Sequence, residues 1–273
     1  MIEGFEFKEK YNANDLASVM SILRSPGGCP WDREQNHKTI RNNFIEEVYE
    51  AVEAIDTGDT ELLKEELGDV LLQIIFHAQI ESEKGSFSFD DVADGIVKKL
   101  IIRHPHVFGD VRVDNSADVL NNWDKIKRDT KNQKNHADSV RSVSPALPAL
   151  MRSEKVQKRA AKAGFDWPDI NGAVDKLYEE ISELKEALER GLKKESEAEL
   201  GDVLFSAVNV SRFMGVSAEE SLTNACGKFI ERFALAERFA LERGLVMEKM
   251  SLSELDGLWD EAKRMLAAGE RFT

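Results

Sequence analysis

Apolar residues recur at three- and four-residue spacing along nearly the whole chain, and no segment shows the strict alternation of a half-buried strand. This pattern predicts an all-α protein. In the first half it predicts helices at 12–24, 37–57, 60–83, 89–102 and 116–130. In the second half it predicts helices at 148–163, 171–190, 194–214, 217–243 and 251–268.

The two series of helices are separated by the segment DTKNQKNHADSVRSVSPALP, which is polar, then punctuated by proline, and has no apolar period. Such a composition is typical of a linker between domains. We therefore expect a first helical unit at 1–130, a linker at 131–146 and a second helical unit at 147–273.

The hexapeptide ELGDVL occurs at Glu66–Leu71 and again at Glu199–Leu204, 133 positions later. The same offset aligns EEVYEAVEAIDTGDTELLKEELGDVL with EEISELKEALERGLKKESEAELGDVL, and further on WDKIKR at 123–128 resembles WDEAKR at 259–264. Self-similarity over such a length indicates an internal repeat. The protein is predicted to be a tandem duplication of one helical-bundle unit.

Each half carries a Glu-Glu-x-x-Glu run followed by Glu-x-x-Asp, and residues three apart share one face of a helix. A short turn at Gly58 makes the two helices of the first unit antiparallel neighbours, so their carboxylates are expected to converge. Hard cations such as Mg²⁺ or Mn²⁺ would relieve the repulsion within such a group. The candidate metal ligands are Glu47, Glu50, Glu66 and Asp69 in the first unit and Glu180, Glu183, Glu199 and Asp202 in the second.

The alternative for such acidic runs is an ordinary solvated helix face. Two observations favour the metal site. Asp69 and Asp202 each open an apolar stretch, VLLQIIF and VLFSAV, that we expect to be buried almost all round, and a carboxylate there needs a partner. The duplication of the whole arrangement decides between the two interpretations.

Basic and aromatic residues recur on the later helices of each unit. Lys99 and Arg103, like Lys228 and Arg232, are spaced to share a helix face, where they suit either salt bridges to nearby acids or contacts to a polyphosphate. The tryptophans of the WDKIKR and WDEAKR segments suit either a core position or stacking on a nucleobase. The sequence leaves both choices open.

Composition limits the classes of partner. The net charge of −14 argues against a nucleic-acid or membrane-surface binder, and no apolar run is long enough to span a membrane. The start, MIEGFEFKEKYN, lacks the features of a signal peptide, and the cysteines Cys29 and Cys226 form no CxxC pattern. These features predict a cytoplasmic protein without structural zinc or disulfides.

Two other classes of protein also use acidic helices. A di-iron carboxylate bundle needs two Glu-x-x-His motifs, and this chain has one, Glu34 with His37. A non-enzymatic helical interaction protein would leave the aspartates within apolar stretches unexplained. Both remain alternatives to a metal-dependent enzyme.

The order of these motifs resembles the all-α nucleoside triphosphate pyrophosphohydrolases, the group that includes the MazG and dimeric dUTPase families. GGCPWDREQ at 27–35 and KVQKRAAKAGFDWPD at 155–169 are similar to hallmarks of the tandem-domain MazG proteins. The resemblance implies Mg²⁺-dependent hydrolysis of nucleoside triphosphates to monophosphates and pyrophosphate by a helical homodimer. A homodimer also suits the broad apolar stripes of the predicted helices.

Carried onto this chain, the resemblance implies that Lys176, Lys228 and Arg232 hold phosphates and that Trp259 lies against the nucleotide. It also implies that the acidic residues named above bind the metal. The expected catalytic group is Glu179, Glu180 and Glu183, in which Glu179 and Glu180 are both candidates for taking the proton of the attacking water.

The two halves differ at positions near these acids. Asn209 lies on the same helix face as Asp202 and could bond a substrate or a metal-bound water, whereas its counterpart is Phe76. Lys176 is replaced by Asn43 in the first half. The second unit is therefore predicted to be the better catalyst.

Overall fold

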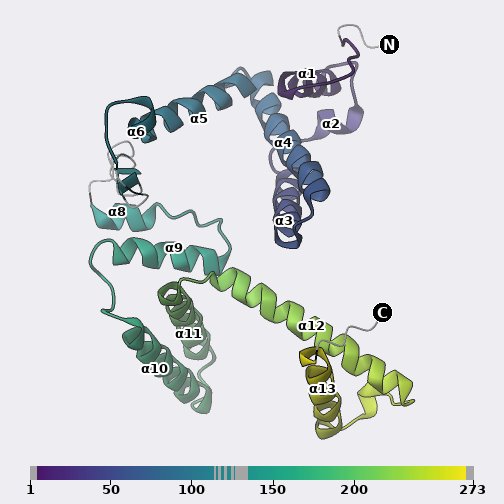
Figure 1. The fold of residues 1–273 in the computed structure, drawn as a ribbon, viewed down its shortest axis with the longest axis vertical. Coiled ribbons are helices and arrows are strands. Elements are labelled where there is room, and N and C mark those ends of the chain that lie inside the picture. The colour runs from purple at the N-terminus through teal and green to yellow at the C-terminus, as the bar shows by residue number, and fades with distance from the viewer. Residues whose placement is uncertain are drawn as a thin grey trace. The chain divides into compact units, whose positions relative to one another are not determined.

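A computed structural model describes residues 5–113, 115, 118–119, 122–123, 126 and 135–268. Within these ranges the chain is helical and has no strand, which confirms the predicted fold class. It divides into two compact units, Met1–Thr130 and Lys131–Thr273 (Figure 1). Most of the helix predicted at 116–130 lies outside the described residues. No described helix is long and apolar enough to cross a membrane.

The first unit is built around one long helix. Its described helices are α1 (Ala13–Arg24), α2 (Pro30–Glu34), α3 (Arg41–Thr57), α4 (Thr60–Glu83), α5 (Phe89–Arg103) and α6 (Pro105–Phe108). α4 packs against α1, α3 and α5. A core of Met20, Ile40, Ile75, Phe76 and Ile80 joins α4 to α1 and to the segment before α3.

The α3–α4 hairpin is set by its turn. Gly58 ends α3 in the left-handed conformation with φ 70°, which glycine adopts without strain. Asp59 then caps α4 by accepting bonds from the backbone N–H groups of Glu61 and Leu62, at 3.1 and 3.0 Å. The sequence placed α4 correctly but began α3 too early, because 37–40 forms a separate turn closed on Asn36.

The second unit repeats the hairpin and extends it. Its described elements are α8 (His136–Arg141), α9 (Ala149–Ala161), α10 (Ile170–Glu189), α11 (Lys193–Met214), α12 (Ala218–Glu242), the 3₁₀ turn η1 (Met247–Lys249) and α13 (Leu252–Ala267). α10 and α11 form the hairpin, with Gly191 at its turn (φ 70°). α13 packs against α12 over a core of Ala236, Phe239, Ala240, Leu258 and Ala262.

The segment assigned to a linker contains the short helix α8. Asn135 caps it by accepting from the backbone N–H of Asp138 at 2.8 Å. Arg159 of α9 donates to the carbonyl of Ser139 and to the hydroxyl of Ser142, and these bonds fasten α8 to α9. The lack of an apolar period hid this helix, since capping and one arginine hold it.

Candidate active site

In the first unit three acidic side chains meet between α3 and α4. Glu47 projects from α3, and Glu66 and Asp69 from the first half of α4. One carboxylate oxygen of each lies within 4.8 Å of the other two, which is a suitable arrangement for a metal ion. Glu66 is 8 % exposed and buried, while Glu47 and Asp69 are half-buried.

These carboxylates repel one another. Burial raises the pKa of Glu47 above its ordinary value, and the charges of Asp69 and Glu50 raise it further. Burial also raises the pKa of Glu66, followed by the charges of Glu50 and Asp69. Glu50 is exposed and lies outside the group of three, but its charge reaches both glutamates.

The second unit repeats this group between α10 and α11. Glu180 of α10 and Glu199 and Asp202 of α11 again bring one oxygen each to within 4.8 Å of one another. Glu180 is buried at 6 % exposure, Glu199 is half-buried and Asp202 is exposed. Three of the four acids predicted to converge in each unit thus do so, while Glu50 and Glu183 lie outside the two groups, and the buried member is a glutamate and not an aspartate.

The expectation of a stretch buried almost all round after each aspartate needs correction in the second unit. Leu204 and Phe205, which follow Asp202, are 51 % and 41 % exposed. In the first unit the residues of the equivalent stretch are all buried or half-buried, on a helix that packs against α1, α3 and α5. The difference follows from the packing, because α11 has close neighbours mainly in α10 and α9.

Lys176 joins the second group from one turn earlier on α10. Its Nζ lies 2.7 Å from Oε1 of Glu179 and 2.9 Å from Oε1 of Glu180, and these two bonds raise the pKa of the lysine. Glu183, exposed and one turn further on, has its pKa raised by burial, opposed by Lys176 and reinforced by Glu180 and Glu199. Lys176 therefore partly compensates the acids beside it.

Apart from Lys176, the residues expected to contact phosphates and nucleotide lie on α12 and α13 of the second unit. Arg232 of α12 places its guanidinium 5.9 Å from the ring centre of Trp259 on α13. The Trp259 ring lies 5.0 Å from that of Phe229. Lys228 is exposed one turn before Arg232. The structure thus brings Arg232 and Trp259 together, on helices other than those that carry the carboxylates (Figure 1).

Asn209 takes part in a hydrogen-bonded contact between α11 and the loop before α10, which the sequence did not predict. Its Oδ1 accepts a hydrogen bond from Nε of Arg212 at 2.9 Å. The guanidinium of Arg212 also donates to both carboxylate oxygens of Asp166, at 2.9 and 2.5 Å. Asp166 lies in the loop between α9 and α10, so Arg212 ties this loop to α11. The contact joins positions 46 residues apart, which no local pattern predicts.

A histidine pair was also missed in the first unit. Nδ1 of His37 lies 2.7 Å from Nδ1 of His77, and Nε2 of His37 lies 2.6 Å from Oε1 of Glu81. Bonds from Lys84 and then from His37 lower the pKa of Glu81 to about 2. Both partners of His37 therefore lie on α4. A di-iron centre would need a second Glu-x-x-His motif, and the described residues contain none.

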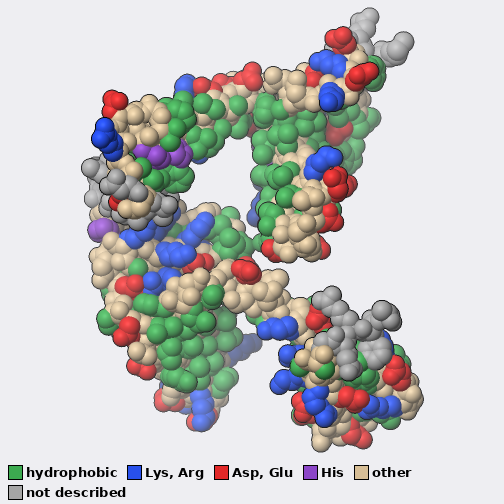
Figure 2. All heavy atoms as spheres, in the orientation of Figure 1, with side chains coloured by type: hydrophobic (Ala, Val, Ile, Leu, Met, Phe, Trp, Pro, Cys, Tyr) green, Lys and Arg blue, Asp and Glu red, His purple; other side chains and the backbone are tan. Residues whose placement is uncertain are grey.

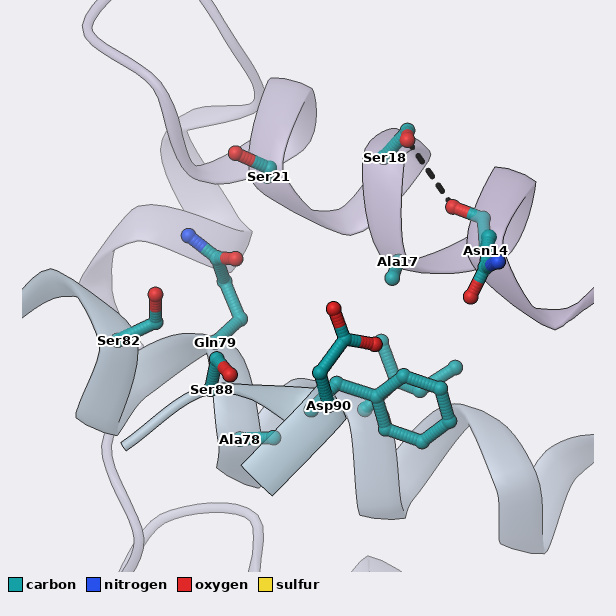
Figure 3. A pocket seen from close by; sticks show the side chains of 11 residues that line it. Asn14, Ala17, Ser18, Ser21, Ala78, Gln79, Ser82, Ser88 and Asp90 are labelled. Atoms are coloured by element: carbon teal, nitrogen blue, oxygen red, sulfur yellow. Dashed lines mark hydrogen bonds between the residues drawn. The ribbon is translucent and has the colours of Figure 1, made fainter. Parts of the chain in front are cut away.

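A cavity of ≈ 320 Å³ lies between α1, the second half of α4 and the start of α5, and Figure 3 shows the carboxylate of Asp90 pointing into it. Its lining consists of Asn14, Ala17, Ser18, Ser21, Ile75, Ala78, Gln79, Ser82, Ser88, Phe89 and Asp90. These described residues include hydroxyls and amides but no lysine or arginine, so the cavity does not suit a polyphosphate.

Fold and site together define a helical protein with two carboxylate groups, each built on its own hairpin and each suited to a divalent cation. The sequence matches the MazG nucleotide pyrophosphohydrolase domain over residues 35–108 and 171–234, which include both hairpins. The chain belongs to this family and is an enzyme of the hydrolase class, as the sequence predicted.

Relatives of known name support this placement. The chain is 45 % identical over 249 residues to the nucleoside triphosphate pyrophosphohydrolase/pyrophosphatase MazG of Thermotoga maritima, covering 91 % of this chain and 94 % of that protein. It is 42 % identical over 252 residues to the nucleoside triphosphate pyrophosphohydrolase of Escherichia coli, covering 91 % and 96 %. The protein YabN of Bacillus subtilis is 47 % identical over 247 residues, which cover 90 % of this chain and 50 % of YabN.

Proposed function

We propose that the protein hydrolyses nucleoside triphosphates to nucleoside monophosphates and pyrophosphate in a Mg²⁺-dependent reaction. The observation that carries the proposal is the pair of carboxylate groups, Glu47 with Glu66 and Asp69, and its repeat around Glu180. The names of the Thermotoga and Escherichia relatives supply the reaction.

The donor atoms of both groups fit a hard divalent cation. All are carboxylate oxygens, the ligands that Mg²⁺ and Mn²⁺ prefer, and each group has one buried member, Glu66 or Glu180. The raised pKa values of Glu47 and Glu66 mark carboxylates that are stabilised when a positive charge enters. Glu50 and Glu183, one turn along the same helices, are proposed as further ligands.

When bound, the metal neutralises charge on the triphosphate and lowers the pKa of a bound water. The remaining work belongs to the side chains of α10. Lys176, already fixed between Glu179 and Glu180, is placed to contact an entering phosphate as a charge-assisted donor. Glu179, Glu180 and Glu183 are the proposed catalytic carboxylates, and Glu179 and Glu180, which both accept from Lys176, are the candidates for taking the proton of the attacking water.

We also propose a homodimer. Apolar side chains gather over the α10–α11 hairpin (Figure 2). Three exposed apolar positions on it, Ile181, Leu188 and Leu200, repeat three on the α3–α4 hairpin, Val48, Ile55 and Leu67.

Pairing of these stripes with a second chain would cover them and would let Lys228, Arg232 and Trp259 of one chain approach the carboxylates of another. Light scattering at micromolar concentration should report twice the chain mass of 30.7 kDa. A monomeric mass would contradict the dimer and leave the catalytic proposal standing.

Nucleoside triphosphates are the proposed partners, with neither nucleic acid nor membrane, in keeping with the charge of −14. The two free cysteines, Cys29 and Cys226, suit the proposed cytoplasmic location.

Product analysis tests the reaction directly. The protein is incubated with a panel of nucleoside triphosphates and Mg²⁺, and the phosphorus products are resolved by ³¹P NMR. Pyrophosphate and monophosphate are expected together, EDTA should abolish both, and excess Mg²⁺ or Mn²⁺ should restore them. Orthophosphate and a diphosphate as first products would remove the pyrophosphohydrolase proposal.

A further inference from the structure

The loop between α9 and α10 carries a partly exposed tryptophan whose ring packs against the first turn of α10. Trp167 is 44 % exposed, and its ring lies over Gly172 in the first turn of α10. A Cβ atom at position 172 would come within 2.9 Å of Cε3 of the indole, so only glycine leaves room for the ring there. The indole is therefore seated on the helix instead of hanging freely in solvent.

The loop is also held in place at the residue before Trp167. Arg212 of α11 holds the carboxylate of Asp166, the residue before Trp167, through two bonds, and Asn209 holds Arg212. Oδ1 of Asp166 in turn accepts from the backbone N–H of Trp167 at 3.0 Å. These contacts fix the backbone at Trp167 while leaving nearly half of its side chain open to solvent.

Trp167 and the carboxylates lie along one helix. On α10, positions four residues apart lie on the same side of the helix, and this side carries Gly172, Lys176 and Glu180. The eight residues from the first to the last of them extend about 12 Å along the helix axis. Along this side of α10 the indole of Trp167 therefore lies at one end, Lys176 in the middle and the acidic group of Glu180 at the other end. This order matches base, phosphates and metal in a nucleoside triphosphate.

We propose that Trp167 is the surface on which the nucleobase of the substrate stacks in the second unit. The inference rests on the proposed function, because it takes the acids at Glu180 as the site of the polyphosphate. An indole binds the π-face that every base has, so this contact stabilises binding without selecting among bases by hydrogen bonds. Asn209 and Arg212 are then positioning residues that hold the loop.

The test compares nucleotides with a ligand that has no base. Trp167→Leu, which keeps apolar packing but removes the π-face, should raise KM for nucleoside triphosphates about tenfold. Inhibition by inorganic triphosphate, which has phosphates only, should keep its Ki. Phe165→Leu is the matched control, because Phe165 lies in the same loop at 84 % exposure, and its KM should stay unchanged.

Trp167→Phe provides a second variant with a smaller π-face, expected to fall between wild type and Trp167→Leu. Thermal unfolding of each variant is followed in parallel. An unchanged KM in Trp167→Leu, or an equal rise in KM and in the Ki of inorganic triphosphate, would overturn the inference by assigning the ring no role or a purely structural one. Absence of pyrophosphate release by the wild-type protein would instead defeat the proposed function.

Discussion

The two hairpins present the same acids in different electrostatic surroundings. On the α3–α4 hairpin, Glu47 has its pKa raised by burial and by the neighbouring carboxylates of Asp69 and Glu50. On the α10–α11 hairpin, the equivalent Glu180 lies 2.9 Å from the ammonium group of Lys176. The position equivalent to Lys176 in the first unit is Asn43, which carries no charge.

The two groups of acids therefore differ by one lysine. In the first unit the carboxylates repel one another, and in the second Lys176 partly compensates their negative charge. The proposed metal ligands are duplicated, but the lysine proposed to contact a phosphate, Lys176, is replaced by Asn43 in the first unit. Because preorganised charge is usually the largest contribution to catalysis, the second unit is expected to carry most of the activity. The first unit depends more on an added metal ion to relieve its repulsion.

The largest expected effect comes from the ligands themselves. Glu180→Gln keeps the volume and hydrogen-bonding capacity of the side chain but removes a negative charge from the proposed metal site. We expect kcat for nucleoside triphosphates to fall ~10²-fold or more, since the bound metal stabilises charge that develops in the transition state. Glu47→Gln, the same change in the first unit, should lower activity much less.

Steady-state kinetics over a panel of triphosphates at saturating Mg²⁺ measures both variants, and circular dichroism checks that each is folded. If the two variants lose activity equally on every triphosphate, the asymmetry is wrong and both units must be counted as active sites.

A smaller effect is expected from the lysine that distinguishes the units. Lys176→Gln should lower kcat/KM about tenfold, the usual cost of one lost charge-assisted contact. The reverse change, Asn43→Lys, places an ammonium group four residues before Glu47 and should lower the raised pKa of that glutamate. Carbon-13 NMR titration of the metal-free protein can follow Glu47, and an unmoved titration would show that Asn43 is not the source of the difference.

Much of the fold could be read from the sequence because each hairpin is encoded locally. Apolar spacing, the glycine at the turn and the caps all act within a few residues, so helix α4 was predicted to its ends. The convergence of Glu66 and Asp69 on Glu47 followed from the same local rules, since a short turn makes the two helices antiparallel neighbours and residues three apart share a helix face.

Other contacts around the carboxylates of the second unit depend on the tertiary fold, and the apolar periodicity of the sequence does not predict them. The bond pair from Arg212 to Asp166 arises only when α11 and the α9–α10 loop come together. The contact of Trp167 with Gly172 spans five residues, but it depends on how the loop enters α10 and not on helical spacing. The contact of Asn209 with a substrate stays a prediction, and the structure adds a bond that the sequence did not predict, from Nε of Arg212 to Oδ1 of Asn209. Helical spacing predicts a shared face but not which neighbour takes the side chain.

The smallest expected effect is on the stability of the metal-free protein, where the same two glutamate variants should diverge. In EDTA at pH 7, Glu47→Gln should raise the melting temperature by about 2–4 °C, because it removes a carboxylate that is costly to keep ionised. Glu180→Gln should lower it by a similar amount, because Glu180 is a partner of Lys176 at 2.9 Å. Scanning calorimetry in EDTA measures both.

The pH dependence supplies the sign of the first effect. Because the pKa of Glu47 is raised in the folded protein, its contribution to stability is fully present below the unfolded pKa of 4.5 and is lost as the pH rises through the folded value. The advantage of Glu47→Gln over wild type should therefore be absent below pH 4.5 and should grow toward neutrality. Added Mg²⁺ should reverse it, since only the complete acidic group gains the full stabilisation of a bound cation. An advantage that persists at low pH would point to packing, and the repulsion that distinguishes the first unit would have to be abandoned.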